Sequence, residues 1–164
     1  MSRRFIRVKS IKNPPLVKNL SELRYVIYKT ITQKIKMMKN NAVGWFEIPV
    51  NDMERAVKFY EEVLNLKMER QMMGPLDMAW FPWQEDGLGS PGSLVKHPDF
   101  YVPSADGVLI YLTAHSGDLS NELARVNAAG GKVIQTKTQI SEEYGYMALI
   151  LDTEGNRVAL HSRK

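Results

Sequence analysis

One carboxylate stands among aromatic and aliphatic side chains in the run from Val43 to Val50. Alternating β-branched and aromatic residues are typical of a strand, and side chains two positions apart point to the same face of that strand. Glu47 therefore shares a face with Trp45. A carboxylate in that position has the chemistry of a general base or of a metal ligand. We expect the functional site on this face.

The residues after this run predict the element that positions it. Pro49 has no amide hydrogen to donate and suits the end of a strand, and Asp52 supplies a helix cap. Beyond Asp52 the apolar residues recur at helical spacing, with charged residues mainly between them. These apolar positions are Met53, Ala56, Val57, Tyr60, Val63 and Leu64. The sequence predicts an amphipathic helix that packs on one face of a sheet.

The rest of the chain predicts two copies of one unit. Residues 66–73, 76–83 and 93–96 read as further strands of the first unit. The pattern then starts again with a strand over residues 108–114 and a helix capped by Asp118 and ended by Gly130 and Gly131. Strands over residues 132–140, 146–151 and 157–161 follow, with a hairpin loop at residues 152–156. We therefore predict an α+β fold of two βαβββ modules, whose open mixed sheets enclose a cleft.

Charge divides the chain unevenly. Residues 1–40 hold eleven Lys and Arg against one acid, whereas residues 41–164 hold eleven against seventeen acids and carry a net charge of −6. We therefore separate a basic extension, residues 1–40, from a domain, residues 41–164, with modules at 41–107 and 108–164. The folded part is mildly acidic, so a nucleic-acid partner is not expected.

The basic extension shows no sustained hydrophobic period. It fits a targeting leader, a basic arm, or translated sequence upstream of the true start, and we favour the last because Met37 and Met38 stand just before the first strand. No apolar run approaches the roughly 20 residues that span a bilayer, so no membrane partner is expected. The chain has no Cys. This removes thiol nucleophiles and thiolate metal sites, and agrees with a cytoplasmic location.

Three motifs carry a resemblance to a known family. They are the strand and helix of residues 46–60, the helix exit of residues 128–133, and the hairpin loop and last strand of residues 152–160. Together, at this spacing, they resemble the vicinal oxygen chelate superfamily, which includes glyoxalase I, extradiol dioxygenases and bleomycin-resistance proteins. The resemblance covers residue 41 to the C-terminus. It implies the fold and leaves the reaction open, because one scaffold hosts several functions. Homodimers are common in this superfamily, so we expect one here.

The resemblance also implies where metal ligands would lie. In metal-dependent members, His, Glu or Gln side chains hold one divalent cation that chelates adjacent substrate oxygens. The matching positions here are Trp45, a residue near Tyr111, Ala159, and one residue within 93–96. None of them supplies a carboxylate or a His. A divalent metal at the usual positions is therefore disfavoured, and the cofactor is left unassigned.

A shifted site is the remaining route to catalysis. Glu47 lies two residues after Trp45, and His161 lies two residues after Ala159, so both keep the parity of the missing ligands. Glu47 would then act as general base or as ligand to an atypical metal, with His161 helping. The alternative is that Glu47 is a hydrogen-bonded strand carboxylate and His161 a surface residue. Two ligands fall short of the three expected at a catalytic metal site. The other histidines stand in loop regions: His97 and His115.

The predicted function is binding of a small, partly aromatic or oxygen-rich molecule in the cleft. The expected ligand-binding side chains are Trp45, Trp80, Tyr111 and Tyr146. The leading interpretation is a glyoxalase-like protein. If it is an enzyme, we expect a lyase, an isomerase or a dioxygenase. The alternative is a non-catalytic protein that sequesters its ligand as bleomycin-resistance proteins do. A regulatory protein with a basic arm is a third interpretation, which depends on residues 1–40 being authentic.

Overall fold

The computed structural model describes residues 19–37, 42–85 and 87–164 of the chain. By their internal contacts the residues form two compact units, Met1–Ala42 and Val43–Lys164. The predicted boundary at residue 40 falls within residues 38–41, which lie outside the described residues. The origin of the basic extension likewise stays a prediction, because residues 1–18 lie outside the described part as well.

The first unit contains a helix that the sequence analysis did not predict, α1 (Leu20–Met37). Asn19 caps it, since its side-chain oxygen accepts the backbone N–H of Glu22 at 2.9 Å. Leu20 and Tyr25 are exposed. Apolar residues of this helix do recur at helical spacing, at Leu20, Leu23, Ile27, Ile31 and Ile35, but the apolar residues between them obscured the period. Among the described residues, no helix is long and apolar enough to cross a membrane.

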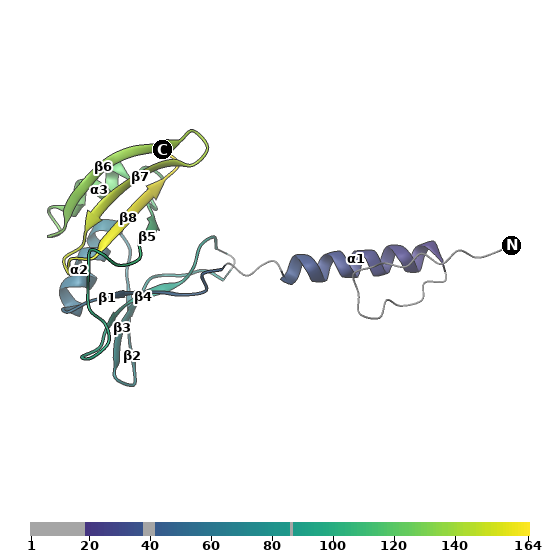
Figure 1. Cartoon of the computed structure of the whole chain (residues 1–164), viewed down its shortest axis with the longest axis horizontal. Coiled ribbons are helices and arrows are strands. Elements are labelled where there is room, and N and C mark those ends of the chain that lie inside the picture. Colours follow the sequence, from purple (N-terminus) through teal and green to yellow (C-terminus); the bar gives the residue numbers. More distant parts are fainter. Residues whose placement is uncertain (1–18, 38–41, 86) are drawn as a thin grey trace. The chain divides into compact units, whose positions relative to one another are not determined.

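The second unit repeats one order of elements twice (Figure 1). The first module is β1 (Phe46–Pro49), α2 (Met53–Leu64), β2 (Glu69–Met73), β3 (Leu76–Trp80) and β4 (Gly92–Lys96). The second module is β5 (Ile110–Thr113), α3 (Ser120–Val126), β6 (Lys132–Ser141), β7 (Gly145–Leu151) and β8 (Arg157–Ser162). The sheet orders are β1-β4-β3-β2 and β5-β8-β7-β6, and the outer pairs β1·β4 and β5·β8 are parallel. The predicted α+β fold of two βαβββ modules is confirmed.

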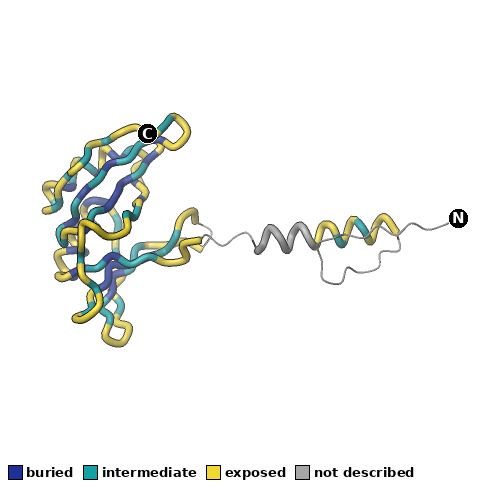
Figure 2. Tube along the Cα trace, viewed as in Figure 1, coloured by how far each residue is buried: buried dark blue, intermediate teal, exposed yellow. Residues whose placement is uncertain are grey.

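One hydrophobic core serves both modules. It joins Ile48 of β1 and Phe59 of α2 to Leu119 and Leu160 of the second module. The buried positions follow the strands and helices of this unit, and its loops are mostly exposed (Figure 2). Gly131, after α3, lies so close to Phe59 that a Cβ there would meet the ring at 2.5 Å. This close approach requires glycine and brings the second module against α2.

Several elements are shorter than predicted, including β1, expected over residues 43–50, and β5, expected over residues 108–114. The strand expected over residues 66–73 begins at Glu69, and the one expected over residues 76–83 ends at Trp80. The helix expected to be capped by Asp118 begins at Ser120, with Leu119 at the cap position. Asp118 still accepts the backbone N–H of Ser120 at 2.9 Å. Its ion pair with Lys137, at 2.7 Å, and that amide lower the pKa of Asp118 to about 2.

The turn between β7 and β8 binds the start of α2. The carboxylate of Glu154 accepts the backbone N–H groups of Asn51 and Asp52, each at 3.0 Å. It also accepts two bonds from the guanidinium of Arg55, at 2.8 and 2.9 Å. The Glu154 side chain is 0% exposed. A carboxylate at a helix N-terminus satisfies amides that have no partner within the helix, so this turn caps the helix of the other module.

Two further residues of the same turn extend this contact. Asp152 accepts the hydroxyl of Tyr60 at 2.8 Å, and burial raises the pKa of Asp152 despite the bonds that it accepts. The amide nitrogen of Asn156 donates to Asp152 and to the carbonyl oxygen of Pro49, each at 2.8 Å. The amide oxygen of Asn156 accepts the backbone N–H of Ser104 at 3.0 Å. The turn thus fixes β1, α2 and the segment between the modules to the start of β8.

We expect Glu154→Ala to lower the free energy of unfolding by about 2 kcal/mol, because two backbone amides and Arg55 lose their acceptor. Burial raises the pKa of Glu154, but Arg55 and the amides outweigh it, so the pKa lies below 4.5. The contact therefore stabilises the fold above pH 4.5, and this is lost as the pH falls through the lower folded pKa. Urea unfolding at neutral and acidic pH measures both effects.

The matched control is Glu143→Ala, since Glu143 is an exposed acid in the turn between β6 and β7. We expect the control to change the free energy of unfolding by less than about 0.5 kcal/mol. Equal losses in the two variants, or a Glu154→Ala loss that is the same at acidic and neutral pH, would contradict this account of the turn.

Candidate functional site

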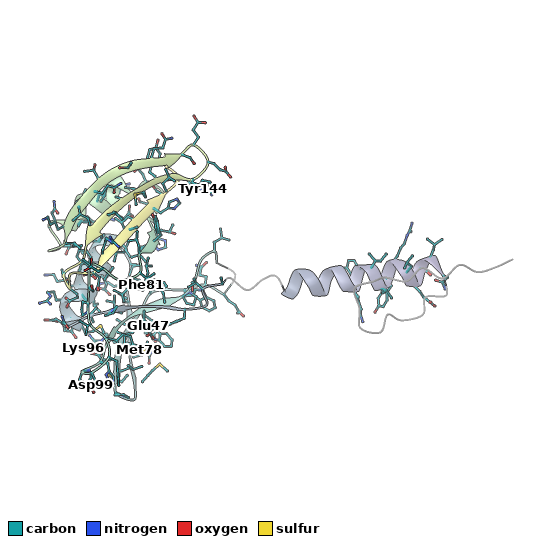
Figure 3. All side chains as sticks on the ribbon, in the orientation of Figure 1. Glu47, Met78, Phe81, Lys96, Asp99 and Tyr144 are labelled. Carbon is teal, nitrogen blue, oxygen red and sulfur yellow. The ribbon has the colours of Figure 1, made fainter. Side chains whose placement is uncertain are left out.

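Glu47 lies on the face of β1 that points away from the shared core, because its neighbour Ile48 is buried in that core. Its Oε2 accepts the hydroxyl of Tyr101, and its Oε1 accepts the indole N–H of Trp45 at 3.3 Å. Figure 3 shows Glu47 on the first sheet. Each oxygen of the carboxylate therefore already holds a donor from the chain itself.

The segment between the modules contacts β1 at this point. Tyr101 brings its hydroxyl to Glu47, and Ser104 is tied to Asn156 through its backbone. At the start of the segment the rings of His97 and Phe100 pack together, with centroids 4.9 Å apart. Sequence reasoning missed the contact with Tyr101, because this residue stands in a stretch without strand or helix periodicity. Tyr101 lies between Pro98 and Pro103, outside any predicted strand. Its side-chain direction and its partner therefore could not be inferred from strand pairing.

A cavity of about 260 Å³ lies where this segment, β1 and the second module meet. We call it the inter-module cavity. Its lining comes from β1, the segment between the modules, β5 and the start of β8: Glu47, Ile48, Pro49, Val102, Ser104, Gly107, Val108, Ile110, Asn156, Arg157 and Val158. Most of these side chains are apolar, and four polar ones, Glu47, Ser104, Asn156 and Arg157, stand among them. This is the composition of a small-molecule site.

Two aromatic residues predicted to bind ligand form a pair beside Glu47. The rings of Trp45 and Trp80 meet edge to face, with centroids 5.6 Å apart. Neither residue lines the inter-module cavity. Trp80 pairs with Ser93 across the first sheet, and Ser93 pairs with Glu47, so the three form a row on one face. The indole nitrogen of Trp80 and the hydroxyl of Ser93 are both buried and have no partner among the described residues.

The predicted residues of the second module lie elsewhere. His161 and Tyr111 share the face of the second sheet that points away from the core, and Tyr111 is 50% exposed. The Nε2 of His161 donates to the carbonyl oxygen of Tyr144, at 2.7 Å. Tyr144 and Glu47 are well separated in Figure 3. The structure therefore does not bring Glu47 and His161 together, and neither His161 nor Tyr111 lines the inter-module cavity.

Tyr146 is placed differently from the expectation. It pairs with Ser162, whose hydroxyl accepts the backbone N–H of Leu119 and so faces the helix layer. Tyr146 packs against the core cluster, and the amine of Lys137 lies 4.7 Å from the centre of its ring. The alternation of residues along β7 did not show on which face of the sheet Tyr146 lies. The register with β8 places it on the core side. Tyr146 is a core residue, which corrects its assignment to the cleft.

The side chains described do not fit a divalent cation. Among residues 19–37, 42–85 and 87–164, no group of three or more His, Cys, Asp or Glu could hold a metal ion. Glu47 is engaged by two donors, and His161 donates to a carbonyl oxygen. His97 is likewise engaged, since its Nδ1 accepts the backbone N–H of Asp99 at 3.1 Å. We therefore derive no metal-dependent step.

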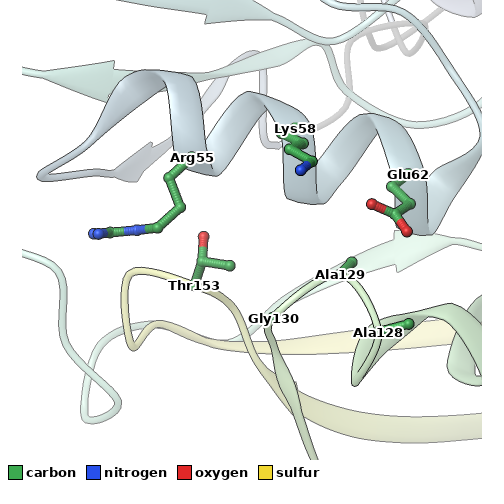
Figure 4. Close-up of a pocket in the computed structure, with 7 residues that line it drawn as sticks. All are labelled: Arg55, Lys58, Glu62, Ala128, Ala129, Gly130 and Thr153. Carbon is green, nitrogen blue, oxygen red and sulfur yellow. The ribbon is translucent and has the colours of Figure 1, made fainter.

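A second hollow, of about 440 Å³, lies between α2 and the end of α3 (Figure 4). Its lining is Arg55, Lys58, Glu62, Ala128, Ala129, Gly130 and Thr153. Arg55 is already bound by Glu154 in the inter-module contact. The other charged residues here, Lys58 and Glu62, are of opposite sign, so this hollow offers no single charge for a ligand.

The family model "Glyoxalase/Bleomycin resistance protein/Dioxygenase superfamily" matches residues 42–160, well over half of the chain. The chain belongs to this superfamily. A glyoxylase-like domain-containing protein from Didymella fabae is 26% identical over 130 residues, covering 77% of this chain and 98% of that protein. The superfamily resemblance inferred from the sequence is confirmed.

Two solved structures with different functions share this fold. Glyoxalase I from Zea mays matches with a TM-score of 0.53 and 18% identity, over 73% of this chain and 45% of that one. This chain thus spans less than half of the maize enzyme. TnmS3, an antibiotic-binding protein from Streptomyces sp. CB03234, matches with a TM-score of 0.50 and 22% identity, over 77% and 99%. Both likenesses show the fold alone.

The contact between Tyr101 and Glu47 predicts a perturbed titration. The bond to Glu47, with smaller contributions from burial and from the carboxylate charge, raises the pKa of Tyr101 above 10.0. Stability from this contact is complete below pH 10.0 and is lost as the pH rises through the higher folded pKa. We expect Glu47→Gln to lower the pKa of Tyr101. NMR of ¹³C-labelled tyrosine rings measures this pKa, and the signal that disappears in Tyr101→Phe identifies Tyr101.

Glu143→Gln serves as the control, because it removes an exposed carboxylate that lies in the turn between β6 and β7, far from Tyr101 in the sequence. The Tyr101 pKa should be the same in this variant and in the native protein. A Tyr101 pKa that Glu47→Gln leaves unchanged would show that the two side chains are not in contact.

Proposed function

We propose that this protein binds a small organic molecule in the inter-module cavity, and that binding needs no metal ion. The observation that carries the proposal is the lining of that cavity, which combines aliphatic walls with a few polar groups from both modules. A ligand there would touch β1, β5, β8 and the segment between the modules at once, so its binding would draw on all four.

The size of the cavity limits the ligand. About 260 Å³ is slightly below the usual range of small-molecule pockets, which begins near 300 Å³. A single ring with one or two polar substituents suits this volume better than an extended molecule does. The aliphatic side chains that would contact such a ring are Ile48, Val102, Val108, Ile110 and Val158.

The hydrogen bonds that Glu47 accepts favour binding without catalysis. A general base must have an oxygen available to the proton that it removes. Here Oε1 and Oε2 each hold a donor, so Glu47 fits the role of a fixed acceptor that secures Tyr101 and Trp45. This agrees with the sequestering alternative, and TnmS3, an antibiotic-binding protein, is an example of a binding role on this fold.

A glyoxalase-like enzyme is the second candidate, because a carboxylate does line the cavity. In that case Glu47 would have to exchange one of its donors for a substrate proton, and the reaction would be a lyase, isomerase or dioxygenase type without His161. Conversion of a bound molecule by the native protein, lost in Glu47→Gln, would favour this enzyme over the binding protein.

Two other expectations stay predictions. Homodimerisation and a cytoplasmic location rest on the superfamily resemblance and on the composition of the chain. Sedimentation of the purified protein tests the first, and microscopy of the tagged protein in its own cell tests the second.

A blocking substitution tests the proposed cavity. Ser104 lines it, and Ala105 beside it does not. We expect Ser104→Trp to abolish binding of small ring compounds that the native protein binds, whereas Ala105→Trp adds the same bulk and leaves binding intact. The probes are benzamide, benzoate and benzylamine, which are a neutral, an anionic and a cationic derivative of similar size. Amide shifts in NMR titrations report their binding.

At least one probe should shift the amides of Ile48, Val102 and Gly107 in the native protein. Shifts confined to the open face of the second sheet, around Tyr111 and His161, would move the site elsewhere. No shift with any probe, or equal binding by the two tryptophan variants, would overturn the proposal.

A further inference from the structure

Among the described residues, Arg157 is the one cation that lines the inter-module cavity. It opens β8 directly after Asn156, whose bonds to Pro49 and Ser104 fix this end of the strand. The Nε of Arg157 is buried and has no hydrogen-bond acceptor within the part of the chain that the structure describes. None of the ion pairs in that part includes Arg157.

The other arginines of residues 43–164 all have acceptors. Arg55 bonds Glu154, Arg70 bonds Asp77, Arg125 bonds the carbonyl oxygen of Val63, and Arg163 bonds the carbonyl oxygen of Glu143. A guanidinium stays charged at any physiological pH, and leaving one of its buried N–H groups without an acceptor is unfavourable. Arg157 is thus the one arginine of residues 43–164 whose guanidinium has no acceptor within the part of the chain that the structure describes.

We propose that the ligand of this cavity is a small carboxylic acid with an apolar body, and that Arg157 binds its carboxylate. This inference rests on the proposed function and adds the ligand's charge to it. The planar fork of a guanidinium matches the two oxygens of a carboxylate, and such charge-assisted bonds are stronger than neutral ones. The aliphatic walls then contact the rest of the molecule.

Glu47 sets the orientation of this ligand. It is the one acidic residue among the described residues that line the cavity, and it stands on β1, whereas Arg157 stands on β8. The ligand's carboxylate therefore lies at the β8 side, and its apolar or hydroxyl-bearing end lies towards β1.

Benzoate and benzamide separate charge recognition from shape, since the two have nearly the same size and differ in charge. In calorimetric or NMR titrations of the full chain at neutral pH, we expect benzoate to bind at least about tenfold more tightly than benzamide. In Arg157→Met the difference should disappear, because the side chain keeps its length and loses its charge. Arg163→Met makes the same charge change just beyond β8 and should preserve the difference.

Comparison of the two probes on the native protein keeps the proposal testable even if Arg157→Met fails to fold. Arg157→Lys gives a second test, because it keeps the charge and loses the fork, so we expect it to retain only part of the preference. Benzamide binding as tightly as benzoate to the native protein would overturn the inference and leave the proposed function standing. The absence of binding by any probe would overturn both.

Discussion

A short polar turn, residues 152–156, holds the two modules of this protein in one arrangement. Its buried Glu154 caps the helix of the other module, and Asn156 binds both the end of β1 and the segment between the modules. These bonds are 2.8 to 3.0 Å long and join both modules, so the start of β8 is fixed against β1. The inter-module cavity lies at this meeting point. The position of the cavity is thus a consequence of how the turn joins the modules.

Much of the fold was predictable because local patterns and the two repeats agreed. The helix capped by Asp52 and the turn at residues 152–156 occur where the sequence placed them, and the first strand occupies Phe46–Pro49 of the predicted run 43–50. The errors arose where tertiary contacts decide. Tyr146 has strand alternation, but only the register with β8 shows which face it occupies. The helical period of α1, seen at Leu20, Leu23 and Ile27, is obscured by the apolar residues that stand between them.

The candidate site was only partly predictable for a related reason. The sequence placed Glu47 on one face of β1 with Trp45, and in the structure Glu47, but not Trp45, lines the inter-module cavity. Its partner Tyr101 comes from a connection with no periodicity, and the unpaired Arg157 is recognisable only once the acceptors of the other arginines are known. The superfamily resemblance predicted the scaffold. It also showed that the usual metal-ligand positions of the superfamily hold no ligand-type side chain in this chain. It did not give the polar groups that this chain places between its modules, because such groups differ among proteins of one fold.

The most direct test is a crystal structure of the protein soaked with benzoate. The account predicts one molecule in the inter-module cavity, with its carboxylate against Arg157 and its ring between Ile48 and Val158. It also predicts that Tyr101 still donates to Glu47. Benzoate bound on the open face of the second sheet beside His161, with the inter-module cavity closed to it, would contradict the central claim that the two modules form their ligand site at this junction.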